Sequence, residues 1–151
     1  MKPHRIAAWG LAAYVVILGL ITLWPTPVDR GAGGELVMKA LRRLHRLGVP
    51  EWVDYGFVEA ASNVLLFVPL GALVVWIMGP GYWWVGAAAG LLLSCLIELA
   101  QFAFLPARYP TLADVLANTA GAALGGLLIL LILHVMARRE DVRNPAPART
   151  L

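Results

Sequence analysis

Four long apolar stretches alternate with short polar segments along the chain. They cover residues 6–24, 60–78, 82–105 and 111–135. Each is 19 to 25 residues long, and a helix of about 20 residues crosses the roughly 30 Å hydrocarbon core of a bilayer. The pattern therefore predicts an all-α polytopic membrane protein with four transmembrane helices.

The segment between the first two stretches has a different period. From residue 35 to residue 47, apolar residues recur at the i, i+3 and i+4 spacing of one helical face, and basic residues occupy much of the rest. Glu35 favours the start of a helix, and Gly48 and Pro50 favour its end. We expect an amphipathic interfacial helix on the membrane surface, although a solvated loop helix packed on the bundle would give the same pattern.

Turn and terminal residues divide the rest of the chain. Gly79-Pro80-Gly81 predicts a tight turn that makes the second and third spans a helical hairpin. The first span lacks a small-residue cleavage site, and its apolar run is longer than the apolar region of a typical signal peptide, so we expect it to be retained. Residues 1–137 then form a single membrane domain, followed by a basic tail, residues 138–151, that we expect to be disordered.

Composition supports this class of protein and excludes others. Of the 151 residues, 60% are hydrophobic and 14% charged, whereas soluble domains have about 25% charged residues. The net charge of +3 comes from loops and tails, where basic residues more often meet lipid head groups than nucleic acid. We therefore expect no nucleic-acid partner. A single cysteine and three scattered histidines also predict no metal and no cofactor.

Basic residues do not decide the orientation in the membrane. Six lie on the side of the two termini and six on the other side, so the positive-inside rule gives a tie. We favour cytoplasmic termini, because four of the opposing six belong to the amphipathic helix and a fifth, Arg108, belongs to the candidate site described next.

Polar residues gather where the second span begins, the third ends and the fourth begins. Alternating topology puts these three places at one membrane face. In each span two polar residues share a helix face: Glu59 and Asn63, Glu98 and Gln101, and Asp114 and Asn118. Glu98 and Asp114 are also the only charged residues inside the four stretches. Arg108 lies in the link between the spans that carry them, and its guanidinium could bind a carboxylate or a phosphate.

Polar side chains inside a membrane are costly, at roughly 2.5–3.5 kcal/mol for a charge at a helix centre, and most face a bundle interior or an aqueous cavity. We therefore predict a polar cleft with Glu98 and Asp114 as candidate catalytic acid and base. The candidate substrate-binding residues are Asn63, Gln101, Arg108 and Asn118. In the alternative interpretation, these side chains only hold the helices together.

The same residues carry a resemblance to a known family. The motifs are N-x-L-x-F-x-P-x-G from Asn63, S-x-x-x-E-x-x-Q from Ser94, then Arg108, and D-x-x-x-N-x-x-G from Asp114. In this order they resemble the VanZ-like family of small bacterial membrane proteins, named for a protein associated with teicoplanin resistance. Members often have an acidic residue soon after the arginine, and residues 109–113 contain none. The resemblance implies a multi-pass protein of the bacterial cytoplasmic membrane.

Two functions follow from these observations. In the first, the cleft binds, and in a stronger form modifies, an anionic lipid or a lipid-linked cell-envelope precursor, with a link to glycopeptide resistance. In the second, the protein is a non-catalytic accessory protein that acts through helix contacts. The motifs Gly86-x-x-x-Gly90 and Gly121-x-x-x-Gly125 allow close helix packing and would also suit a homo-oligomer.

Overall fold

The structure, a computed structural model, describes residues 3–24, 32–106 and 110–143. Within these ranges the chain forms five α-helices and one short 3-10 helix and has no strand. The elements are α1 (Pro3–Thr22), α2 (Ala32–Arg46), α3 (Tyr55–Met78), η1 (Pro80–Tyr82), α4 (Trp83–Phe104) and α5 (Leu112–Arg143). Four of them, α1, α3, α4 and α5, are long and apolar enough to span a membrane. This confirms the all-α class and the four spans.

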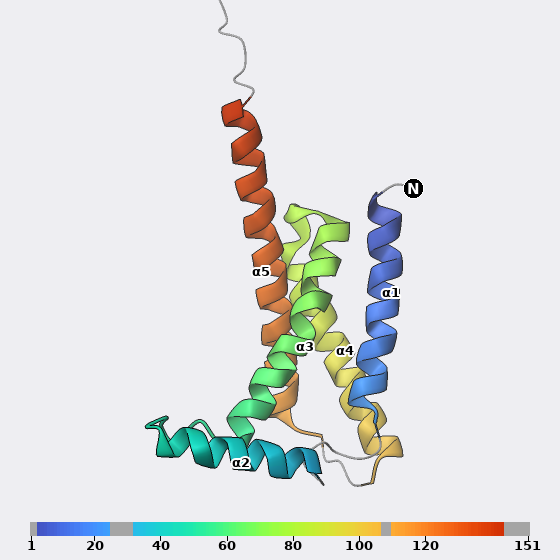
Figure 1. Ribbon diagram of the computed structural model, residues 1–151. Helices are drawn as coiled ribbons and strands as arrows, with labels where there is room; N and C mark the ends of the chain where they lie inside the picture. The colour runs from blue at the N-terminus through green and yellow to red at the C-terminus, as the bar shows by residue number, and fades with distance from the viewer. Residues whose placement is uncertain (1–2, 25–31, 107–109, 144–151) are drawn as a thin grey trace, which may run out of the picture.

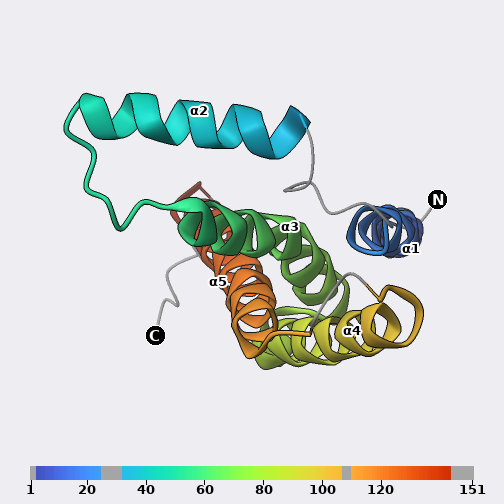
Figure 2. The ribbon, with the colours of Figure 1, turned by 90° about the horizontal axis from the view of Figure 1, so that it is seen from below.

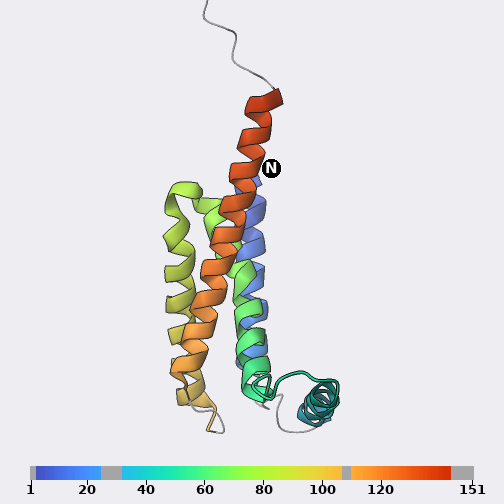
Figure 3. The same cartoon turned by 90° about the vertical axis from the view of Figure 1, so that its left-hand side faces the viewer.

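The helices form an upright bundle with one helix lying crosswise beside one end (Figure 1). α5 packs mainly against α3 and then against α4, and α1 contacts mainly α3. α2 lies crosswise beside the bundle, at the level of the end at which α3 and α5 begin and α4 ends, as Figures 2 and 3 also show. The start of α1 and the end of α5 lie at the opposite end. A helix is therefore present between the first two spans, and its place on a membrane surface stays a prediction.

The bundle is apolar outside and partly polar inside. Large apolar side chains point outward, with Leu65 70% and Phe102 69% exposed. Several polar side chains are buried: Ser94, Glu98, Gln101 and Asn118. A water-soluble protein would place these two groups the other way round. The distribution is that of a helix bundle surrounded by lipid, so the chain is a multi-pass membrane protein.

Glycines bring α3, α4 and α5 close together. A Cβ atom added at a glycine would overlap a neighbouring backbone carbonyl in three pairs: Gly121 with Val64, Gly125 with Val68, and Gly71 with Ala122. Gly90 similarly faces the Cβ of Ala122. The Gly-x-x-x-Gly faces of α4 and α5 are thus covered within one chain. A homo-oligomer, which stays a prediction, would have to use another surface.

A proline in α3 marks the contact with α1. Pro69 lies inside α3, and it has no N–H to donate to the carbonyl of Leu65 one turn earlier. The next carbonyl, that of Leu66, accepts a hydrogen bond of 2.6 Å from the hydroxyl of Tyr14 on α1. Neighbouring helices often supply hydrogen bonds at such interruptions in membrane proteins. With Leu18, which is 1% exposed, this bond holds α1 to the bundle.

The start of α3 and the end of α1 differ from the predicted spans, and the turn between α3 and α4 agrees with its prediction. α3 begins at Tyr55 rather than at residue 60, because the Asp54 carboxylate caps it and accepts a 2.9 Å hydrogen bond from the Phe57 amide. α1 ends at Thr22, two residues before the end of the predicted span. The hairpin between α3 and α4 is present, and Gly79 adopts a φ of 93° there, which glycine allows without strain.

α5 is longer than the predicted span and continues to Arg143, into the segment that the sequence assigns to the tail. Residues 127–144 contain no glycine or proline that would end the helix. One turn before the predicted tail begins, His134 accepts a hydrogen bond of 2.8 Å from the Nε of Arg138. The remainder of that tail, residues 144–151, lies outside the described residues.

Candidate functional site

Three of the predicted site residues meet at the α2 end of the bundle. Asn63 lies in the third turn of α3, Glu98 two turns before the end of α4, and Asp114 in the first turn of α5. The common membrane face predicted from alternating topology is therefore the end at which α3 and α5 begin and α4 ends (Figure 1).

Asp114 joins α5 to α3. Its Oδ1 accepts a 2.6 Å hydrogen bond from the Nδ2 of Asn63, and its Oδ2 accepts a 2.7 Å bond from the hydroxyl of Thr111. The Thr111 oxygen in turn accepts a 3.0 Å bond from the Asp114 amide. Thr111 directly precedes α5, so it caps the helix in the manner of a capping box.

Glu98 reaches the same threonine from α4. Its Oε2 accepts a 3.0 Å hydrogen bond from the backbone N–H of Thr111, and the residue is only 7% exposed. Two carboxylates from different helices therefore converge on one residue at the start of α5. The N-terminus of a helix carries a partial positive charge, which favours acidic groups at this place.

A second polar layer lies deeper in the bundle. Asn118 and Ser94 are each one turn further inside than Asp114 and Glu98, a step of about 6 Å at 1.5 Å per residue. The Nδ2 of Asn118 donates a 2.8 Å hydrogen bond to the hydroxyl oxygen of Ser94. The Oδ1 of Asn118 is buried and has no hydrogen-bond partner among the described residues. Such an open acceptor is uncommon, because buried polar atoms are nearly always paired.

Gln101 contacts α1, and its part in substrate binding stays a prediction. Although it is buried, at 6% exposure, its Nε2 donates a 2.8 Å hydrogen bond to the carbonyl of Thr22 at the end of α1. Gln101 therefore fastens α4 to α1. Arg108, the predicted anion-binding residue, lies outside the described residues.

Thr111 is the site residue that the sequence reasoning missed. It links both carboxylates, through its backbone N–H to Glu98 and through its hydroxyl to Asp114. The signal was present in the sequence, since Thr111-x-x-Asp114 before an apolar run is a capping-box motif. Thr111 is neutral and was not among the six charged and amide residues predicted for the site.

The arrangement offers hydrogen-bond acceptors and a pair of acidic groups. Ionised carboxylates only accept hydrogen bonds, and two of them near one point can act as acid and base. Over the described ranges, no group of three or more histidine, cysteine, aspartate or glutamate side chains could hold a metal ion. Each hydrogen bond described for the site connects two helices or caps one, so the site and the packing of the bundle share the same residues.

These features define a class: a polytopic helical membrane protein with a polar site at one end of its bundle. The family model VanZ/LLP1 matches residues 11–133, and the chain belongs to the VanZ/LLP1 family. This confirms the resemblance carried by the motifs. The matched region includes all the site residues described above. Searches of curated proteins and of solved structures returned no match.

Proposed function

We propose that the polar end of the bundle binds an anionic lipid or a lipid-linked cell-envelope precursor. In its stronger form the proposal has Glu98 and Asp114 act on the bound molecule as acid and base. The observation that carries it is the convergence of these two carboxylates on Thr111. Acidic groups are expensive inside a membrane and tend to mark functional sites.

Two further features support binding. The open acceptor of Asn118 offers a hydrogen bond to a donor that none of the described residues supplies. Arg108 lies in the link that joins the two carboxylate-bearing helices in sequence. We propose that Arg108 binds the anionic group of the ligand, because a guanidinium can bind two phosphate oxygens at once.

The family supplies the setting of the proposal. We place the protein in the bacterial cytoplasmic membrane with both termini in the cytoplasm, and we connect its ligand to glycopeptide susceptibility. Glycopeptides act at the cell envelope, so a protein that handles an envelope lipid could change the response to teicoplanin.

The stronger form is tested by comparing the lipids of cells that lack the protein with those of cells that carry it. Wild type, Glu98→Gln and Glu140→Gln are produced at equal abundance. Glu140 is an exposed carboxylate near the far end of α5 and serves as the matched control. We expect wild type and Glu140→Gln to restore the same lipid profile, and Glu98→Gln to resemble the deletion. Identical profiles for the deletion and wild type would exclude the enzymatic form.

The alternative is an accessory protein that acts through helix contacts. A bulky substitution in its glycine motifs would not test this function. Gly121 packs against Val64 of the same chain, so a bulky residue there would disturb the bundle under either function. Asp114→Asn is the better discriminator. The accessory function predicts a nearly silent change in teicoplanin susceptibility, whereas the site proposal predicts a loss of function.

A further inference from the structure

α2 has three distinct sides. One side faces the protein, where Gly34 and Leu41 are buried. On the same side, the Nε2 of His45 donates a 3.0 Å hydrogen bond to the carbonyl of Val53. The side next to it is apolar and exposed, and it consists of Leu36, Ala40, Leu44 and Leu47.

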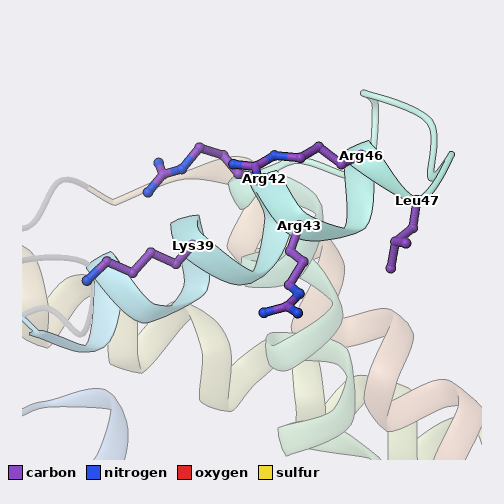
Figure 4. Close-up of a pocket in the computed structure, with 5 residues that line it drawn as sticks. All are labelled: Lys39, Arg42, Arg43, Arg46 and Leu47. Atoms are coloured by element: carbon purple, nitrogen blue, oxygen red, sulfur yellow. The ribbon is translucent and has the colours of Figure 1, made fainter.

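The third side of α2 is basic. Four basic side chains are exposed along it: Lys39, Arg42, Arg43 and Arg46. They line an open depression together with Leu47, and Figure 4 shows them extending from the helix. The only acidic residue in α2 is Glu35, whose carboxylate lies 3.7 Å from the Lys39 ammonium. The helix therefore keeps a formal excess of three positive charges.

The position of α2 decides what this surface meets. It lies crosswise beside the bundle, at the level of the end at which α3 and α5 begin, and the sides of the bundle are covered by apolar residues (Figures 1 and 3). Lipid around the bundle therefore ends at the level of α2, where the head groups lie. An exposed apolar stripe beside a basic stripe suits this level, because the leucines reach the acyl chains and the long basic side chains reach the head groups.

We propose that the basic side of α2, Lys39, Arg42, Arg43 and Arg46, is a binding surface for anionic phospholipid head groups. This surface concentrates anionic lipid at the end of the bundle where Glu98 and Asp114 lie. The argument rests on charge complementarity, since basic clusters beside transmembrane helices attract anionic lipid. The proposal does not depend on Glu98 or Asp114, so it holds even if these two residues only hold the helices together.

The test measures which lipids surround α2. A Cys95→Ala protein with the single change Leu44→Cys carries a fluorescent label on the apolar stripe. It is reconstituted in equal parts of phosphatidylcholine and phosphatidylglycerol, with one or the other lipid brominated. The ratio of the two quenching efficiencies gives the enrichment of the anionic lipid. We expect enrichment of several-fold, and a smaller enrichment for each basic residue removed.

Three comparisons make the outcome decisive. The combined change of Lys39, Arg42, Arg43 and Arg46 to glutamine should bring the two quenching efficiencies to parity. Arg138→Gln with Arg139→Gln, at the other end of the bundle, should leave the enrichment unchanged. If the combined variant does not fold, the wild type decides, because salt screens exposed charges and should lower the enrichment. Parity in the wild type, enrichment that salt does not change, or enrichment that survives the combined change would overturn the proposal.

Discussion

Midway along the bundle, α3 and α5 meet backbone against backbone, whereas at the α2 end the same two helices are joined through side chains. In the middle, the glycines of α5 lie directly on the carbonyls of α3, at Val64 and Val68. At the end, Asn63 and Asp114 bridge the helices with one hydrogen bond. The two regions lie on the same pair of helices: on α5 they are about two to three turns apart, whereas on α3 Val64 directly follows Asn63.

The difference concerns how much change each region can tolerate. A steric contact between backbones has no room for an added atom, because the backbone cannot rotate away as a side chain can. A hydrogen bond between side chains can be lost, shifted or given to another partner. The glycine region is therefore suited to define the packing, and the polar end is suited to exchange partners with a ligand.

The largest expected effect comes from Gly121→Ala. The new Cβ would overlap the Val64 carbonyl, and overpacking of this kind costs typically about 1–3 kcal/mol of stability. Thermal unfolding in detergent and abundance in the membrane should both fall. Gly10→Ala is the matched control, since nothing lies within 4 Å of a Cβ at that position of α1. Equal stability of Gly121→Ala and wild type would contradict the close packing of α3 on α5.

A smaller effect is expected at the polar end. A double-mutant cycle of Asn63→Ala and Asp114→Ala should give a coupling between about 0.6 kcal/mol, the average for hydrogen bonds between membrane helices, and about 1.7 kcal/mol, the maximum found. The measurement is the unfolding free energy of the two single variants and the double variant. A coupling near zero would show that the 2.6 Å bond does not hold α3 to α5.

Tyr14→Phe tests the attachment of α1. It removes the hydroxyl that donates to the Leu66 carbonyl, and the expected loss is about 0.6 kcal/mol, the average for hydrogen bonds within membrane bundles. Tyr82→Phe, at an exposed tyrosine, is the control and should change nothing. A loss as large as that of Gly121→Ala would mean that this bond contributes far more than an average hydrogen bond between membrane helices.

The smallest effect is expected outside the bundle, at Glu35→Gln. The Glu35–Lys39 pair is exposed on both sides, and pairs at this helical spacing contribute about 0.2–0.5 kcal/mol. Unfolding curves of the variant and of wild type should nearly coincide. A clear loss of stability would indicate that α2 supports the fold as well as the membrane contact.

Much of the fold could be predicted from the sequence because the membrane imposes a length on each apolar helix. The spans, the hairpin at Gly79 and the meeting of polar residues at one end all follow from length and alternation. The ends of the helices were harder to predict. α3 begins early at the Asp54 cap, and α5 runs on past its apolar stretch, since helix ends depend on local capping rather than on hydrophobicity.

Within the site, the sequence did not predict which side chains form hydrogen bonds with one another. A helical spacing shows which residues share a face, but it does not show which partner each side chain meets. Gln101 shares a face with Glu98 and yet bonds to Thr22 on α1, and Ser94 pairs with Asn118. The glycine motifs likewise predicted close packing without revealing that the neighbouring helix is α3 of the same chain.

The central claim, that the polar end holds an anionic ligand, is tested most directly by the lipid that the purified protein retains. Mass spectrometry of the intact protein–lipid complex would compare Arg108→Gln with Arg138→Gln, an arginine on the far part of α5. Both are made in the protein whose four basic residues on α2 are glutamine, so that surface lipid does not contribute. The account predicts that Arg138→Gln keeps a bound anionic lipid or precursor and that Arg108→Gln loses it. The same retained lipid in both variants, or none in either, would contradict the account.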